Sequence, residues 1–362
     1  MIEKQLVALT KDLMKFKTTK NNLDEINKCI DYIIRYLSPY DMKLKKYVYE
    51  KKPSLTVTYE DIKKPEFFLL GHIDVVEAEK CDFEPKIQKN KLFGRGSVDM
   101  KAGVAIMMRL MVEFSRQKQK PSVGLMITSD EESDGNCSKY LIEQENYNCC
   151  FAVVLEGTDL QIVTEEKGFI FLKIRAKGVS SHSSTPWLGD NAIEKLIESY
   201  RKIKNLFLDN SRNSWKISLN LGKISGGDSI NKVPDSAELF LDIRYPEPYT
   251  KKEIMNKITR IQGIEIEELN SGNTLKTSVK NEYVQRFKQI TNETLEKDTQ
   301  IIKFPATSDG RFFSKKGVPT IIFGPRGKNY HGKNEYVEIK SLVKCYTILY
   351  AFILGELDRK DR

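Results

Sequence analysis

The 362 residues of the chain exceed the roughly 250–300 residues that one hydrophobic core usually holds, so we expect two domains. The net charge of +9 comes from lysines spread along the chain beside glutamates, without a basic run interleaved with aromatic residues, which disfavours nucleic acid as a partner. No stretch approaches the roughly 18 apolar residues of a membrane helix, and the first residues lack a signal-peptide pattern. We therefore expect a cytoplasmic protein with no membrane partner.

The six cysteines form no CxxC pair and no regular framework. This spacing favours reduced thiols with a mainly structural role over a set of disulfides.

In chain order, the apolar periodicity first predicts two helices. One has Leu6, Leu9, Leu13 and Phe16 on a single face, and the other has Leu23, Ile26, Ile30 and Leu37 on a single face. Short apolar runs then predict buried strands at Phe67–Leu70, Val123–Thr128, Phe151–Leu155 and Thr320–Phe323. Helices are predicted at Ala102–Phe114, Val284–Leu295 and Ser341–Leu357. These elements indicate an α/β sandwich with helices on both faces of a sheet.

The middle of the chain has a different pattern. Strands are predicted at Phe169–Ala176, Trp215–Ile224, Ala237–Tyr245 and Ile264–Leu269, with helices at Asn191–Leu208 and after a capping box formed by Thr250 and Glu253. The order β-α-β-β-α-β is that of a ferredoxin-like unit. We therefore expect a small domain of residues 169–275, inserted into a larger one made of 1–168 and 276–362.

Polar side chains follow three of the predicted strands directly. His72 and Asp74 follow the first, the run Asp130–Glu132 follows the second, and Glu156 follows the third. Open α/β sheets bind ligands at the carboxyl ends of their strands, so we expect these groups to converge.

Asp99 precedes the helix that begins at Ala102, and His331 follows the last predicted strand. Each of these residues has an ordinary alternative: Asp99 could cap its helix, and an acidic run after a strand is usually a solvated loop. Their joint placement instead favours a site for two zinc ions bridged by one carboxylate.

The same motifs occur in the order found in a known superfamily. They are Gly71–Val76, Gly94–Gly96 with Asp99–Lys101, Ser129–Glu132, Leu155–Gly157 and the late His331. They resemble the di-zinc amidohydrolases and peptidases that include acetylornithine deacetylase, succinyl-diaminopimelate desuccinylase, aminoacylase and related di- and tripeptidases. The resemblance spans nearly the whole chain. It implies a zinc-peptidase-like α/β/α sandwich catalytic domain with an inserted ferredoxin-like lid.

The resemblance also implies a ligand for each metal position. Asp99 would bridge two zinc ions, for which cobalt or manganese could substitute. His72 and Glu156 would complete one ion, and Glu132 and His331 the other.

Two carboxylates have other roles in the resembling proteins. Glu131 would be the general base, and Asp74 would orient the His72 imidazole, a common arrangement beside metal ligands. The resemblance further implies a cis peptide bond between Asp99 and Met100.

Two residues of the inserted domain are matched by the resemblance. His182 would stabilise an oxyanion, reaching it across a dimer interface or by domain closure, and the alternative is a histidine that caps a local turn among serines. Asn231 lies in Ser225–Pro234 and would contact substrate, although this segment could also be a glycine-rich hairpin turn.

Three further residues are candidates for substrate binding. Arg244 would bind a substrate carboxylate through its guanidinium fork, and the alternative is an ordinary surface arginine at a strand end. Ser308 and Gly310 belong to Thr307–Phe312, which resembles a deacetylase and desuccinylase signature whose backbone could cradle substrate.

These assignments predict hydrolysis of the amide bond of a small N-acyl amino acid, with metal-bound water attacking the carbonyl and Glu131 as general base. Glu156 favours this activity, because many of the related peptidases have aspartate at that position. The sequence departs from many relatives at Glu77, where they have a proline after the His-x-Asp-Val-Val stretch. The alternatives are a metallo-dipeptidase acting on short peptides, and a catalytically silent relative, which would normally have lost a ligand or the base. Acetylornithine and succinyl-diaminopimelate, intermediates of amino-acid biosynthesis, are the leading candidate substrates. The resemblance also implies a homodimer formed through the lid.

Overall fold

The computed structural model describes residues 1–207 and 215–360, which form two compact units. Unit 1 holds residues 1–165, 276–302 and those from 308 on, and unit 2 holds Glu166–Leu275 and Lys303–Thr307. The short segment Lys303–Thr307, expected in the larger domain, groups with unit 2, where Thr307 Oγ1 donates a hydrogen bond of 2.5 Å to Lys167 O.

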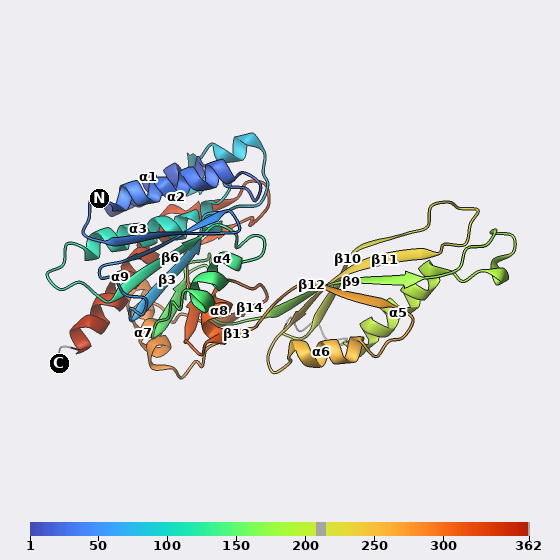
Figure 1. The fold of residues 1–362 in the computed structure, drawn as a ribbon. Coiled ribbons are helices and arrows are strands. Elements are labelled where there is room, and N and C mark those ends of the chain that lie inside the picture. Colours follow the sequence, from blue (N-terminus) through green and yellow to red (C-terminus); the bar gives the residue numbers. More distant parts are fainter. Residues whose placement is uncertain (208–214, 361–362) are drawn as a thin grey trace. The chain divides into compact units, whose positions relative to one another are not determined.

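A nine-stranded sheet runs through unit 1 (Figure 1). The strands along its main path are in the order β1 (Lys43–Tyr49), β2 (Lys52–Thr58), β6 (Val123–Thr128), β3 (Phe67–His72), β7 (Phe151–Val154), β15 (Thr320–Ile322), β8 (Ile162–Glu166) and β13 (Leu275–Lys276), with β14 (Ile301–Phe304) paired to β8. The central strands β6, β3, β7 and β15 are parallel, whereas β1 and β2 form an antiparallel hairpin at one edge. The predicted α/β class is confirmed.

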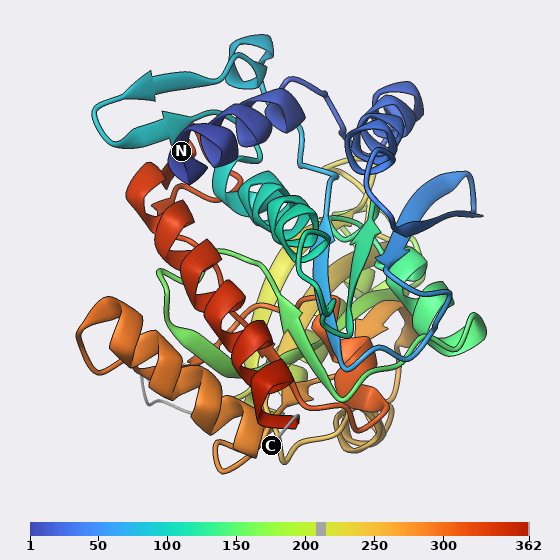
Figure 2. The ribbon, with the colours of Figure 1, turned by 90° about the vertical axis from the view of Figure 1, so that its left-hand side faces the viewer.

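Alternate residues of the buried strands face opposite helical layers. Phe67 and Leu69 belong to a core shared with α1 (Ile2–Met14), α2 (Leu23–Leu37), α3 (Ala102–Phe114), α7 (Glu282–Leu295) and α9 (Ile339–Lys360). Figure 2 shows α3 and α9 running across this face of the sheet. On the other face, Phe68 stacks on Phe313 of α8 (Gly310–Lys315), and α4 (Asn136–Lys139) lies over β1, β2 and β6. Both faces are therefore covered, which is why the strands are apolar throughout.

The start of α3 packs so closely on the chain after β7 that it requires glycine. A Cβ at Gly103 would lie 2.3 Å from Leu155 O, whereas a Cβ at Gly355 in α9 would meet nothing nearer than 3.8 Å. We expect Gly103→Ala to lower the free energy of unfolding by about 1–3 kcal/mol through overpacking. Gly355→Ala, the same change in another helix of unit 1, should be neutral or stabilising by up to about 1 kcal/mol. Chemical denaturation of both variants checks this, and equal stabilities would contradict it.

Unit 2 is an antiparallel sheet with two helices on one face. Its strands lie in the order β10 (Ser218–Gly226), β11 (Ser236–Tyr245), β9 (Gly168–Lys177) and β12 (Glu265–Gly272), and its helices are α5 (Ala192–Leu206) and α6 (Lys251–Ile258). The helices pack on apolar residues at alternate positions of β9 and β11, such as Leu172 and Leu241. Thr250 and Glu253 form the predicted capping box at the start of α6. Leu208, the predicted end of the first helix, lies outside the described residues.

A small third sheet joins distant parts of the chain. It contains β16 (Gly327–Lys328), β17 (Tyr336–Glu338), β5 (Lys91–Phe93) and β4 (Lys86–Gln88) in this order. Because β17 pairs with β5, the segment after His331 runs beside the segment before Asp99.

All six cysteines are free thiols, and Cys29, Cys137 and Cys345 are buried. Across the described part of the chain, no helix has the length and apolar character needed to cross a membrane.

Candidate metal centre

The centre lies where β6, β3 and β7 end side by side. Because β3 is parallel to both neighbours, with His72 opposite Thr128 and Leu70 opposite Val154, the residues that follow these strands meet at one edge of the sheet. The structure thus brings together the segments that carry His72, Glu131 and Glu156.

His72 and Asp74 hold this edge together. The His72 Nδ1 atom lies 3.0 Å from Asp74 O and 3.3 Å from Asp74 Oδ1, so its Nε2 faces the opposite way. The Asp74 carboxylate also accepts hydrogen bonds from the backbone N–H groups of Glu131 (3.3 Å) and Glu132 (2.9 Å). Asp74 therefore contacts both the imidazole and the loop after β6.

Two groups of three side chains, sharing Asp99, place their ligand atoms within 4.8 Å of one another. We call His72, Asp99 and Glu156 the inner triad, and Asp99, Glu132 and His331 the outer triad. In the inner triad, His72 Nε2 lies 3.1 Å from Glu156 Oε1 and 3.4 Å from Asp99 Oδ1. The peptide bond after Asp99 is cis, as the resemblance implied.

The outer triad is more open to solvent. His331 Nε2 lies 3.0 Å from Asp99 Oδ2 and 3.1 Å from Glu132 Oε1. The side chain of His331 is 53% exposed, whereas that of His72 is 2% exposed. The two positions therefore differ in how easily an ion would reach them.

The opposing charges shift the pKa values of these groups. Burial lowers the pKa of His72, but the surrounding carboxylates, led by Glu156, raise it well above its usual value. Hydrogen bonds to Asp99 and Glu132 raise the pKa of His331 to about 10. Burial and the Asp99 charge raise the pKa of Glu156 to about 7.

These shifts predict how metal affinity depends on pH. The raised pKa values favour the protonated form of both imidazoles in the metal-free protein, whereas a metal ion binds only the neutral ring. Cobalt affinity should therefore rise as pH increases from 6 to 8, by about tenfold per pH unit for each proton displaced. Calorimetry in buffers of different ionisation enthalpy counts the protons released. Affinity that does not change with pH, without proton release, would contradict the prediction.

Glu131 lies beside the inner triad, with Oε2 3.8 Å from His72 Nε2 and a side chain 15% exposed. Burial raises the pKa of Glu131 well above its usual value, although the His72 charge opposes this. Glu131 also lines a cavity of about 10 Å³, together with His72, Ser138, Glu156 and Asp309. Such a space is about the size of one water molecule.

The structure reveals polar residues around this centre that the sequence analysis did not single out. The buried Asp309 carboxylate accepts hydrogen bonds from Ser138 Oγ (2.5 Å) and Thr128 Oγ1 (3.4 Å). Glu335 is also buried and receives hydrogen bonds from the segment before Asp99. Asp309 stands in the Thr307–Phe312 segment and Glu335 lies four residues after His331, but nothing in their spacing predicts these contacts.

Ser308 and Gly310 lie in unit 1 and are buried. The Ser308 Oγ accepts a hydrogen bond of 3.3 Å from Gly310 N, and Ser308 O accepts one of 3.2 Å from Arg311 N. These hydrogen bonds shape the start of α8. Because of them, Ser308 Oγ, Ser308 O and Gly310 N already have partners.

His182 and Asn231 lie on neighbouring loops of unit 2. Two backbone contacts hold the loops together. They are an isolated antiparallel β-bridge between His182 and Lys232, and a hydrogen bond of 3.1 Å from Ser183 N to Asn231 O. The exposed His182 side chain places Nδ1 2.8 Å from Ser184 Oγ, which is the local turn contact considered as the alternative for this residue.

Arg244 lies on the face of the unit 2 sheet opposite the helices. Its Nε and Nη2 atoms donate to the two oxygens of Asp242, at 2.8 and 3.1 Å. The guanidinium also lies over the rings of Phe169 and Phe171, 5.3 and 5.5 Å from their centroids. These contacts fix the guanidinium in one orientation and occupy two of its nitrogen donors.

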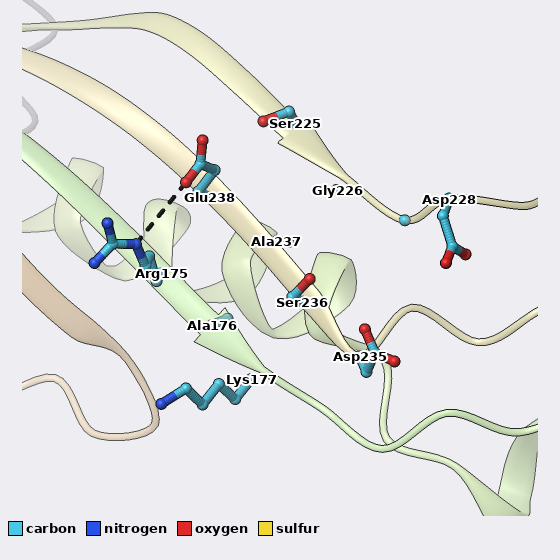
Figure 3. A pocket seen from close by; sticks show the side chains of 11 residues that line it. Arg175, Ala176, Lys177, Ser225, Gly226, Asp228, Asp235, Ser236, Ala237 and Glu238 are labelled. Atoms are coloured by element: carbon cyan, nitrogen blue, oxygen red, sulfur yellow. Dashed lines mark ion pairs between the residues drawn. The ribbon is translucent and has the colours of Figure 1, made fainter.

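A cavity of about 370 Å³ lies elsewhere on unit 2, where β9, β10 and β11 meet (Figure 3). The two basic residues that line it are paired across strands: Arg175 Nε lies 3.9 Å from Glu238, and Lys177 Nζ contacts Glu265 at 2.5 Å. It contains no histidine or cysteine, so its donor set does not match that of a zinc site.

Comparison with known proteins identifies the class of protein that this fold and centre define. The sequence model that describes peptidase family M20/M25/M40 matches residues 68–355 of this chain. The chain therefore belongs to this family of hydrolases, which confirms the resemblance.

Individual relatives are more distant. The probable succinyl-diaminopimelate desuccinylase of Staphylococcus aureus is 27% identical, with 96% of each chain covered. A probable carboxypeptidase of Talaromyces marneffei is 28% identical over 93% of this chain and 82% of its own. The crystal structure of a Staphylococcus aureus tripeptidase superposes with a TM-score of 0.82 at 22% identity and 97% coverage of both chains, which supports the fold alone.

Proposed function

We propose that this protein hydrolyses the amide bond of small N-acyl amino acids at a centre of two divalent metal ions. The observation that carries this proposal is the pair of triads that share Asp99. Imidazole nitrogens and carboxylate oxygens are ligands suited to zinc, with cobalt or manganese as substitutes. His72 and Glu156 would complete one ion, and Glu132 and His331 the other. When bound, such metals supply Lewis acidity that activates water and polarises an amide carbonyl.

Glu131 would move the proton in this reaction. It lies within the centre but belongs to neither triad, so its carboxylate is free to act as a base. Its raised pKa suits a group that takes a proton from the attacking water and gives it to the leaving amine nitrogen. Asp74 would keep His72 in the orientation that presents Nε2 to the inner position.

The residues proposed for substrate recognition are His182, Asn231 and Arg244 in unit 2, and Ser308 and Gly310 in unit 1. His182 would stabilise the oxyanion, and Arg244 would share its guanidinium between Asp242 and a substrate carboxylate. The resemblance to the family also makes a homodimer through unit 2 part of the proposal.

A metallo-dipeptidase is the second candidate, because the chain belongs to a family of peptidases and is similar to a probable carboxypeptidase. The glutamate at position 156 and the similarity to a desuccinylase over 96% of the chain favour the deacylase.

A substrate panel separates the two candidates. Chelator-treated protein, resupplied with zinc or cobalt, would be assayed on succinyl-diaminopimelate, acetylornithine, other N-acetyl amino acids and simple di- and tripeptides. We expect release of an acyl group that the chelator abolishes. Turnover of the peptides alone would replace the deacylase with the peptidase, and no turnover with metal bound would contradict both.

A further inference from the structure

We propose that Glu335 is a positioning residue that ties the loop carrying Asp99 to the loop carrying His331, and so sets the affinity of the outer triad for its metal. This inference rests on the metal centre of the proposed function. It concerns a residue that lies outside both triads.

The Glu335 carboxylate is the common acceptor for the segment that precedes α3. It accepts hydrogen bonds from Arg95 Nη1 (2.6 Å), Gly96 N (3.0 Å), Val98 N (3.0 Å), Asp99 N (3.3 Å) and Ser97 Oγ (3.4 Å). Gly96 has a φ of +76°, a left-handed conformation that glycine adopts readily. The turn gathers several backbone N–H groups around one anion, an arrangement known as a nest.

The same residue also fixes the loop that carries His331. Gly94 N donates to Glu335 O at 2.9 Å, and Arg95 Nη2 donates to Gly332 O at 3.2 Å. Asn329, His331 and Asn334 have φ values of +65°, +58° and +57°, so this loop depends on its surroundings to keep its shape. Glu335 and Arg95 together form a bridge between the two loops.

The two triads depend on this bridge to different degrees. In the inner triad, His72 ends β3 and Glu156 follows β7, so the central sheet places two of the three ligands. In the outer triad, only Glu132 follows a strand of that sheet, while Asp99 and His331 stand on the bridged loops. Loss of the carboxylate would leave buried N–H donors without their acceptor and release both loops.

Glu335→Gln tests the bridge because it keeps the side-chain size and replaces one acceptor oxygen with an NH₂ group. Metal-free protein would be titrated with cobalt by calorimetry and visible absorption. We expect the first ion to bind within about threefold of the wild-type affinity and the second to bind about 10- to 100-fold more weakly. The control is Glu79→Gln, since the exposed Glu79 contacts Lys333 of the same loop at 2.8 Å. It should bind both ions as the wild type does.

A folded Glu335→Gln variant, judged by circular dichroism, that binds two cobalt ions with wild-type affinities would overturn the proposal. If that variant does not fold, Arg95→Lys provides the test, because it keeps the charge but loses the guanidinium fork that reaches Gly332. A weaker second ion in this variant supports the bridge, and an unchanged one overturns it. Wild-type protein that binds no cobalt would overturn the metal centre itself, and this inference with it.

Discussion

Glu131→Ala should lose about 10²- to 10⁴-fold in kcat while it still binds two metal ions. The carboxylate belongs to neither triad, and Oε2 lies 3.8 Å from His72 Nε2, so its removal leaves every proposed ligand in place. Burial raises the pKa of Glu131 above its usual value, which suits a group that takes up and returns a proton, and alanine has no such group. Steady-state kinetics and a cobalt titration of the same preparation measure the two effects.

Asp134→Asn is the matched control, because Asp134 stands in the same loop but its side chain is exposed. It should keep nearly full activity. Near-normal turnover in Glu131→Ala would remove this residue from its proposed role, whatever its metal content.

Asp99→Ala should have the second large effect, the loss of metal and activity together. Asp99 is the member common to both triads, with its two oxygens 3.4 Å from His72 Nε2 and 3.0 Å from His331 Nε2. Without it, each triad would retain two of its three proposed ligands. We expect a larger fall in metal affinity than the roughly 10- to 100-fold that follows loss of a supporting residue.

Glu156→Ala provides the comparison for Asp99, since it would remove a ligand from the inner triad alone. In a calorimetric titration, Asp99→Ala should weaken both binding events and Glu156→Ala chiefly one. If Asp99→Ala bound two ions with wild-type affinity, the shared-ligand assignment would be wrong.

The central elements of unit 1 could be predicted because their burial leaves a strong pattern. Helix α3 at Ala102–Phe114 and strand β6 at Val123–Thr128 have the predicted bounds, since both are mostly apolar and almost entirely buried. The edge strand β1 and the small strands β4 and β5 were not predicted. Their residues are mostly exposed or half-buried, and β5 pairs with β17, which lies far away in the chain.

The side chains of the candidate site were predictable where they follow strands. His72 and Glu156 meet because parallel strands bring their carboxyl ends to one edge, which the sequence pattern alone suggests. Glu335 could not be found in this way, because its contacts depend on a loop more than 200 residues earlier in the chain. The pairing of Arg244 with Asp242 was missed although the two residues, two apart on one strand, necessarily share a face.

Anomalous X-ray scattering from crystals grown with zinc tests the metal centre most directly. At the zinc absorption edge, we predict two peaks: one among His72, Asp99 and Glu156, and one among Asp99, Glu132 and His331. Two ions that share a carboxylate should lie about 3.5–4 Å apart. Zinc-saturated crystals without a peak at either triad, or with peaks only elsewhere on the protein, would contradict the assignment of the two triads as the metal centre.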